Sequence, residues 1–384
     1  MTPKDVLTNK TFCPMPWTGL MYNFDGTVKN CIRSAETIGN IKDALIEDIV
    51  LGKANDTRQS MIMNSIYTQN CKPCHDLEAG KSGFDMISDR VFYIRELKHV
   101  PLDTYRANNF DLKTIDVRWS NLCNFACVYC NPDYSSKWAS ELNVIAETPT
   151  QEQRDNFKQY IFDRAGQLDH VYLAGGEPLL MKENLELLSK LDPDTNIRIN
   201  TNLSKVDTQV FERICEFKNV HWIVSVETIE EEYEYIRYGA KWQDFLDNLN
   251  IIRNLGHKVS FNMLHFLLNY QSVFGCVDYL SNMGFHNNSF ILGPLTQPHY
   301  LTIRQLPQHM LDSVKTTLEK RIADKPGFLL EDGYRNMLNY IQEPASKNLL
   351  ESLRHIDQLD ARRNLNSRKT FKHLYKEINH GKTI

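Results

Sequence analysis

From about residue 113 onward, short strand-like runs alternate with longer segments of helical periodicity. The run 113–119 alternates apolar and polar positions, as expected for a strand with one buried face. Segments such as 208–217 and 242–255 have the spacing of helices. Five further strand-like runs follow the first one, at 170–174, 196–200, 221–226, 259–264 and 289–293. Six strands joined by helices predict parallel βαβ units, which close into a full or partial (β/α) barrel or open into a doubly wound sheet.

Two regions depart from this alternation. Residues 1–110 lack a repeated strand and helix pattern, and we interpret them as a separate small module. Residues 301–384 are predicted to form a helical extension, with the periodicity concentrated in 306–322 and 348–378. The predicted α/β domain is therefore 111–300.

Prolines and basic residues mark the helical extension. Pro307, Pro326 and Pro344 are expected to start or break its helices. We interpret a basic cluster near its end as a solvated helix face; its members are Arg362, Arg363, Arg368, Lys369 and Lys372.

Charge and composition narrow the class of function. The 384 residues carry a net charge of −4 with both signs interspersed, which argues against nucleic acid as a partner. The chain starts without the apolar core of a signal peptide, and no apolar run approaches the roughly 20 residues of a membrane span. We therefore expect a cytoplasmic protein with no membrane partner. Nine cysteines in a reducing compartment favour metal ligation over disulfides.

The densest group of cysteines follows the first strand of the α/β series. Cys123, Cys127 and Cys130 have C-x3-C-x2-C spacing on a predicted loop. Cysteine thiolates hold iron-sulfur clusters, and three of them leave one iron of a [4Fe-4S] cube open to a cofactor or substrate. Three buried thiols without a metal are the alternative. The spacing, with Tyr129 directly before the last cysteine, resembles the signature of the radical S-adenosylmethionine (radical SAM) superfamily.

This resemblance implies a [4Fe-4S] cluster that binds S-adenosylmethionine (SAM) inside a partial (β/α)6 TIM-like barrel. Segments at the strand ends resemble those that contact the cofactor in the family. The residues so implied are Tyr129, Gly175, Gly176, Glu177, Asn200, Thr201, Asn202, Ser225, Glu227 and Arg237.

Each segment has an ordinary alternative. The tetrad 175–178 resembles the family's GGEP motif at the methionine amino group, and its adjacent glycines permit close backbone approach; a simple turn is the alternative. Segments 200–202 and 225–227 resemble ribose-binding segments, although Glu227 stands where many related sequences have aspartate; helix caps are the alternative. Arg237 resembles an arginine that pairs with the methionine carboxylate, or it is a surface residue.

Four more cysteines, Cys13, Cys31, Cys71 and Cys74, lie in the N-terminal region. Four thiolates suffice for a structural zinc or a fully ligated iron-sulfur cluster. The order of a tryptophan, an Asp-Gly turn, a cysteine, a Gly-Asn pair and a Cys-x-x-Cys motif resembles the SPASM/twitch auxiliary-cluster module, placed here ahead of the barrel. That resemblance implies a second [4Fe-4S] cluster for electron transfer or structural support, with zinc as the alternative.

Relatives with such modules mostly modify peptides or proteins. The resemblance therefore implies reductive cleavage of SAM to a 5′-deoxyadenosyl radical and hydrogen abstraction from a peptide or protein side chain. A reductive electron donor such as flavodoxin or ferredoxin would be a partner, and no further catalytic residue is assigned. The first alternative is radical dehydrogenation or rearrangement of a small polar metabolite, which a narrow lumen charged by Asp116, Arg118 and His265 would favour. The non-enzyme alternative is a zinc-stabilised binding scaffold.

The remaining candidates have bland interpretations. Cys215 and Cys276 fall in apolar helical segments, where a free cysteine behaves as a small hydrophobe, so we expect them to pack. Asn262 and His265, on the fifth strand, either face substrate or have a packing or capping role.

Overall fold

The computed structural model describes residues 11–52, 55–58, 69–79, 88–96, 109–343 and 347–380. Contacts between residues divide the chain into two compact units. The first unit comprises Met1–Leu122, Asn143–Asn200 and Asp207–His221. The second comprises Cys123–Leu142, Thr201–Val206 and Trp222–Ile384.

The first unit is built on a sheet with the strand order β3-β2-β1-β4-β5-β6. The strands are β1 (Gly19–Tyr22), β2 (Thr27–Lys29), β3 (Gly39–Asn40), β4 (Thr114–Val117), β5 (His170–Leu173) and β6 (Asn196–Thr201). Strands β4, β5 and β6 are parallel, and β1 pairs antiparallel with β2 and parallel with β4. The N-terminal segment therefore continues the sheet of the α/β series through β1.

Helices pack on this sheet. They are α2 (Met15–Thr18), α3 (Ile46–Leu51), α5 (Lys72–Glu78), α6 (Asp89–Glu96), α8 (Gln151–Phe162), α9 (Lys182–Leu188) and α10 (Gln209–Cys215), with 3-10 turns at Gln69–Cys71, Ala165–Gln167 and Pro178–Leu180. A capping box between Thr150 and Gln153 starts α8. Phe157 of α8 is buried and stacks on Tyr22 of β1 with ring centroids 4.2 Å apart, which joins the helix to the core.

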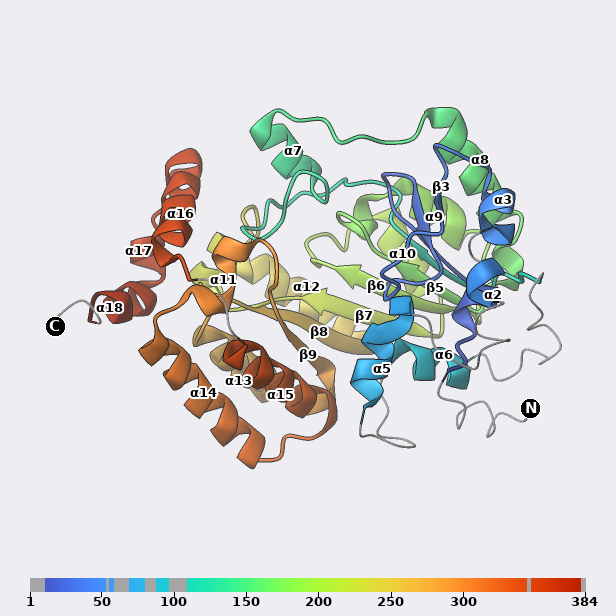
Figure 1. The fold of residues 1–384 in the computed structure, drawn as a ribbon. Helices are drawn as coiled ribbons and strands as arrows, with labels where there is room; N and C mark the ends of the chain where they lie inside the picture. Colours follow the sequence, from blue (N-terminus) through green and yellow to red (C-terminus); the bar gives the residue numbers. More distant parts are fainter. Residues whose placement is uncertain are drawn as a thin grey trace. The chain divides into compact units, whose positions relative to one another are not determined.

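The second unit holds the last three strands and most of the remaining helices. The strands are β7 (Val220–Ser225), β8 (Lys258–His265) and β9 (Phe290–Pro294), and β8 is parallel to β9. The helices are α7 (Ser136–Leu142), α11 (Glu230–Ile236), α12 (Trp242–Asn254), α13 (Ser272–Asn282), α14 (Gln308–Ala323), α15 (Phe328–Gln342), α16 (Leu349–Arg363), α17 (Ser367–Thr370) and α18 (Lys372–His380), with 3-10 turns at Asn287–Ser289, His299–Leu301 and Ile303–Gln305. Helix α15 packs on β9 and α14, whereas α16, α17 and α18 follow one another at the C-terminal end (Figure 1).

The predicted alternation is confirmed. Each of the six predicted strands corresponds to one of β4–β9, and the helical segments 208–217 and 242–255 correspond to α10 and α12. The α/β class, the strand and helix succession of a partial (β/α)6 barrel, and the helical C-terminal region are present. Pro307 caps α14 as predicted, and Pro344 lies outside the described residues. No helix in the described ranges is long and apolar enough to cross a membrane.

Candidate functional site

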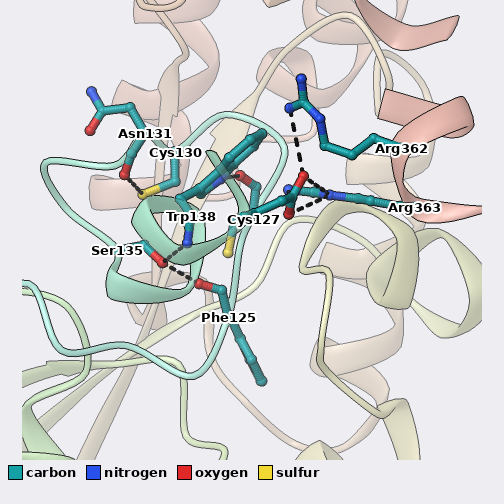
Figure 2. Close-up of polar contacts among 9 residues, drawn as sticks. Phe125, Cys127, Cys130, Asn131, Ser135, Trp138, Arg362 and Arg363 are labelled. Carbon is teal, nitrogen blue, oxygen red and sulfur yellow. Dashed lines mark hydrogen bonds and ion pairs between the residues drawn. The ribbon is translucent and has the colours of Figure 1, made fainter. Parts of the chain in front are cut away.

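The three cysteines Cys123, Cys127 and Cys130 lie on an irregular loop that leads into α7. Residues of α7 fasten this loop. The Cys123 N–H donates to the Ser136 hydroxyl over 3.1 Å. The Trp138 indole Nε1–H donates to the Cys127 carbonyl over 2.7 Å; both of these residues are drawn in Figure 2. Two of the three cysteines are therefore held through their own backbone groups.

Nitrogen donors surround the sulfur atoms of this loop. Cys123 Sγ accepts from the Phe125 N–H over 3.5 Å and from Asn202 Nδ2 over 3.9 Å. The guanidinium of Arg237 lies 4.0 Å from Cys127 Sγ through Nη1. Donors and cations near sulfur stabilise the thiolate, which is the form that ligates iron. The residues present therefore fit an iron-sulfur cluster.

Burial favours the protonated form of the Cys127 and Cys130 thiols when no metal holds them. Burial raises the pKa of Cys127, while Arg237 and Arg363 act in the opposite direction. Burial, followed by the neighbouring Cys127, raises the pKa of Cys130 to about 12. Cluster binding must displace these protons. Across the described part of the chain, no three His, Cys, Asp or Glu side chains converge on a single metal ion. In a [4Fe-4S] cube each cysteine ligates a different iron, so its ligands need no common centre.

Three residues predicted separately for the cofactor contact one another. Arg237 Nε donates to Glu227 Oε2 over 2.8 Å, a second guanidinium nitrogen reaches the other carboxylate oxygen, and the Tyr129 hydroxyl donates to Glu227 Oε1 over 2.9 Å. Glu227 is 1% exposed and Arg237 3%. The Asn269 amide donates to the Glu227 carbonyl over 3.1 Å. The carboxylate and the guanidinium are thus engaged with each other beside Cys127.

Two of the other strand-end residues make local turn contacts. Thr201 Oγ1 and Asn202 Oδ1 each accept a hydrogen bond from the backbone N–H two residues further on, over 2.8 and 2.9 Å. Asn202 Nδ2 also donates to Asn124 Oδ1 over 3.2 Å, within the cysteine loop. Asn200 lies on β6, and Ser225 ends β7. Thr201 and Asn202 thus form local turns rather than helix caps, since the next helix begins at Gln209 and is capped by Thr208, and Asn202 in addition contacts the cysteine loop.

In the first unit, the tetrad that begins at Gly175 closes against the chain just before the cysteine loop. Gly175 has a φ of +122°, which favours glycine. A Cβ on Gly176 would lie 2.3 Å from the Leu122 carbonyl oxygen, which accepts the Glu177 N–H over 2.7 Å. Glu177 is fully buried and its Oε1 accepts the Leu179 N–H over 3.1 Å. The close approach predicted from the paired glycines is present, and it is to the protein's own backbone.

The four N-terminal cysteines line one cavity in the first unit. Burial raises the pKa of Cys13 well above its ordinary value, and Cys71, Cys31 and Cys74 raise it further. Burial and then Cys74 raise the pKa of Cys31 to about 12. Tyr93 of α6 also lines this cavity. The structure thus brings together cysteines that are up to 61 positions apart in the sequence.

Charged side chains stand at the wall of the same cavity. Asp116 of β4 lines it, and Arg118 Nη2 lies 3.1 Å from Asp116 Oδ2. Burial raises the pKa of Asp116 to about 6 against the opposing effect of Arg118. In the sheet, Asp116 is paired with Tyr172 and Tyr172 with Arg198, so the three side chains project from one face.

The other lumen candidate is buried in the second unit. His265 is fully buried, its Nε2 lies 2.9 Å from the Tyr270 carbonyl oxygen, and burial lowers its pKa to about 4. His265 thus has the packing role that was the alternative to a contact with substrate. Asn262 carries a backbone role, since its carbonyl accepts the Val226 N–H over 3.2 Å. Cys276 is fully buried, as expected for a packing residue.

One residue of the basic cluster is wrongly interpreted from the sequence alone. Arg362, Arg368, Lys369 and Lys372 are exposed, but Arg363 is buried. A signal for this exists in the sequence. Arg363 continues the spacing of the buried stripe of α16 at Ser352, Ile356 and Leu359.

A loop of three thiols bordered by nitrogen donors, in an α/β fold, is suited to hold an iron-sulfur cluster. Residues 117–280 match the model of the Radical SAM superfamily. This segment of the chain is therefore similar to the radical SAM superfamily, in agreement with the resemblance of its motifs.

Relatives and solved structures of the superfamily are similar to parts of the chain. A GTP 3′,8-cyclase of Campylobacter lari is 26% identical over 145 residues, which is 36% of this chain and 42% of the relative. A GTP 3′,8-cyclase of Sulfurimonas denitrificans is 28% identical over 170 residues, which is 42% of this chain and 50% of the relative. The chain thus spans half or less of the length of these relatives.

Among solved structures, native anSMEcpe with bound AdoMet has a TM-score of 0.41 and 15% identity, covering 56% of this chain and 60% of its own. Streptococcus suis SuiB bound to the precursor peptide SuiA has a TM-score of 0.41 and 13% identity, covering 76% of this chain and 66% of its own.

Proposed function

We propose that this chain reductively cleaves SAM at a [4Fe-4S] cluster held by Cys123, Cys127 and Cys130. One electron from a donor such as flavodoxin or ferredoxin breaks a sulfonium C–S bond, giving methionine and a 5′-deoxyadenosyl radical that takes a hydrogen atom from the substrate. The observation that carries this proposal is the donor-lined cysteine loop. Arg237 and Asn202 direct N–H groups at its sulfurs, and such groups compensate the charge of thiolate ligands.

The cofactor contacts remain part of the proposal. We propose that SAM is held, as the resemblance implies, by Gly175, Gly176, Glu177, Asn200, Thr201, Asn202 and Ser225. Because Glu227 and Arg237 are bound to each other, their contribution in this proposal is to support the cysteine loop, together with Tyr129.

A peptide or protein side chain is the substrate class proposed first, on the resemblance of the N-terminal region to auxiliary-cluster modules. A small polar metabolite is the second candidate, favoured by the face that carries Asp116, Tyr172 and Arg198. Oδ1 of Asp116 is buried and has no hydrogen-bond partner among the described residues. A substrate with a hydrogen-bond donor would satisfy that oxygen.

We also propose a second [4Fe-4S] cluster on Cys13, Cys31, Cys71 and Cys74. These thiols line one cavity, yet no three of the metal-ligating side chains within the described ranges converge on one ion. A zinc ion held by the same four sulfurs at about 2.3 Å is the alternative. A cluster with four cysteine ligands has no open iron, so it would accept the electron left on the substrate after hydrogen abstraction.

Metal content and EPR of anaerobically reconstituted protein test both clusters. Two four-iron clusters give about eight irons per chain. Replacing Cys123, Cys127 and Cys130 by alanine should lower this to about four and remove the EPR signal that changes on addition of SAM. Four irons and one zinc in the wild type would restrict the N-terminal site to a structural role. A wild type without iron would refute the proposed function.

Cleavage of SAM distinguishes the substrate classes. Formation of 5′-deoxyadenosine should be stimulated by a peptide pool if the first candidate is correct, and by amino acids, sugars or nucleotides if the second is. Asp116→Asn should abolish only the second stimulation, and Asp192→Asn, at an exposed position, serves as its control. Cys71→Ala should leave cleavage intact while stopping turnover; an unchanged product yield would refute electron transfer through the N-terminal cluster.

A further inference from the structure

Two adjacent arginines at the end of α16 have opposite environments. The side chain of Arg363 is 1% exposed and that of Arg362 is 41% exposed. Burying a guanidinium requires a counter-charge and hydrogen-bond acceptors, because its transfer out of water is costly. The partners of Arg363 therefore show what it does.

Arg363 is held by one carboxylate and two aromatic rings. Its Nε donates to both carboxylate oxygens of Glu141 on α7, each over 3.1 Å (Figure 2). Its guanidinium carbon lies 4.3 Å from the ring centroid of Trp138 and 4.4 Å from that of Tyr238. A planar guanidinium is suited to contact aromatic faces in this way while it binds a carboxylate.

Both of these aromatic residues form hydrogen bonds with the cysteine loop, at the neighbouring loop residues Ala126 and Cys127. The Trp138 indole N–H donates to the Cys127 carbonyl over 2.7 Å. The Tyr238 carbonyl accepts the Ala126 N–H over 2.9 Å. Arg363 thus contacts the two residues that hold the backbone of the loop at Cys127.

We propose that Arg363, a residue of the helical C-terminal region, is a positioning residue for the cluster of the cysteine loop. By fixing Trp138 and Tyr238 it sets the position of Cys127, and its positive charge stabilises the more negative, reduced cluster. The proposal rests on the proposed function to the extent that this loop holds a cluster. It makes the C-terminal region part of the cluster site.

The measurement is the reduction potential of the SAM-binding cluster, followed by EPR in a redox titration, with the N-terminal cluster of the same protein as an internal reference. In Arg363→Met, the cation is lost and the stack loosens. The ratio of reduced to oxidised cluster at a fixed potential should fall about tenfold, which is about 59 mV for one electron. Arg362→Met is the matched control, because it removes a neighbouring charge that lies 3.6 Å from the same carboxylate but is exposed. It should change that ratio less than twofold.

A second variant covers the case in which Arg363→Met does not fold. Trp138→Phe keeps a ring for Arg363 and removes the N–H that binds the Cys127 carbonyl. It should change the EPR line shape of the SAM-binding cluster without changing that of the N-terminal cluster, and its effect should not add to that of Arg363→Met. Arg363→Lys, which keeps the charge but not the fork, should recover part of the potential.

The outcomes separate the inference from the proposed function. If the wild type binds no cluster on the loop, the proposed function fails. Suppose instead that the wild type binds the cluster, and that in Arg363→Met and Trp138→Phe the cluster has the wild-type reduction potential and EPR line shape while only the melting temperature changes. Arg363 then has only a packing role and the inference fails. Equal effects of Arg362→Met and Arg363→Met would reduce the role to nonspecific charge and overturn it as well.

Discussion

The buried ion pair between Glu227 and Arg237 makes a large stability effect predictable. In Glu227→Gln the side chain keeps its shape and still offers the Tyr129 hydroxyl an oxygen acceptor, but the Arg237 charge loses its counter-charge. Arg237 is only 3% exposed, so water cannot solvate that charge unless the site opens. Removing one partner of such a pair costs about 3–5 kcal/mol, and we expect that decrease in the free energy of unfolding.

Urea unfolding of the apoprotein, followed by circular dichroism and fluorescence, measures this loss. A matched control is Glu234→Gln, because Glu234 and Lys241 form an ion pair 2.9 Å long whose side chains are 35% and 69% exposed. Exposed pairs contribute about 0–1 kcal/mol, so this variant should be close to the wild type. The double variant Glu227→Met/Arg237→Met buries no charge and should lose less than Glu227→Gln alone.

Two results would contradict the reasoning. One is a loss in Glu227→Gln no larger than that in Glu234→Gln, which would mean that Arg237 finds water or another partner. The other is a double variant that loses as much stability as Glu227→Gln alone, or more. If Glu227→Gln instead keeps its stability and loses only affinity for SAM in the reconstituted protein, the pair opens to bind the cofactor, and the contacts implied by the family resemblance are correct.

Three further predictions concern acid stability, close packing and the cysteine protons. The pKa of His265 is lowered from 6.5 to about 4, so the unfolded chain takes up a proton at higher pH than the folded protein does, and the free energy of unfolding should fall by about 3 kcal/mol between pH 6.5 and pH 4. His265→Gln should make the free energy of unfolding, measured with urea, less dependent on pH in this range. The same pH dependence in the variant and the wild type would contradict this. Gly176→Ala should destabilise the apoprotein by about 1–3 kcal/mol, because its Cβ would lie 2.3 Å from the Leu122 carbonyl oxygen. Gly166→Ala is the control and should not destabilise the protein, since no atom lies within 4 Å of its Cβ. Equal melting temperatures of the two variants would contradict the prediction. The pKa of Cys130 is raised to about 12, so Cd²⁺ must displace a proton to bind its sulfur. The affinity of the apoprotein for Cd²⁺, measured by the absorbance of the thiolate complex between pH 6.5 and 8.5, should therefore rise by up to about tenfold per pH unit for each proton displaced. Binding that does not depend on pH would contradict protonated thiols.

The strands of the α/β series were predictable because each is a short apolar run between helices of clear periodicity. Strand β1 was not. It has only four residues, all buried, so it shows no alternation of apolar and polar positions. Its parallel pairing with β4 joins Gly19 to Thr114, and a contact over that separation leaves no local signal. The sequence therefore predicted a separate module for residues 1–110, although β1 extends the sheet of the α/β series.

The candidate site was predictable as a set of residues but not as a set of contacts. Glu227 and Arg237 were each matched to a different part of the cofactor, because a motif assigns roles one residue at a time. Their mutual pairing depends on the path of the chain through α11, which ends at Ile236, directly before Arg237. Arg363 was treated as one of several like charges, although its spacing along α16 separates it from its exposed neighbours.

The placement of Arg237 beside Cys127 follows from the hydrogen-bonding needs of the loop's backbone. A segment without regular secondary structure must find partners elsewhere for its buried N–H groups. The loop does so by pairing with the end of α11 and the residues that follow it. The Ala126 N–H donates to the Tyr238 carbonyl over 2.9 Å, and the Val128 N–H donates to the Ile236 carbonyl over 2.8 Å.

These two hydrogen bonds flank Cys127 on one side and Arg237 on the other, so the pairing itself brings the guanidinium to the sulfur. The arginine is then fixed by main-chain geometry before its charge is considered. Arg237→Lys should therefore keep a cation near Cys127 but lose the two-pronged contact with Glu227. The reduction potential of the reconstituted cluster, compared between Arg237→Lys and the wild type, would show how much of the effect of Arg237 comes from its charge and how much from its shape.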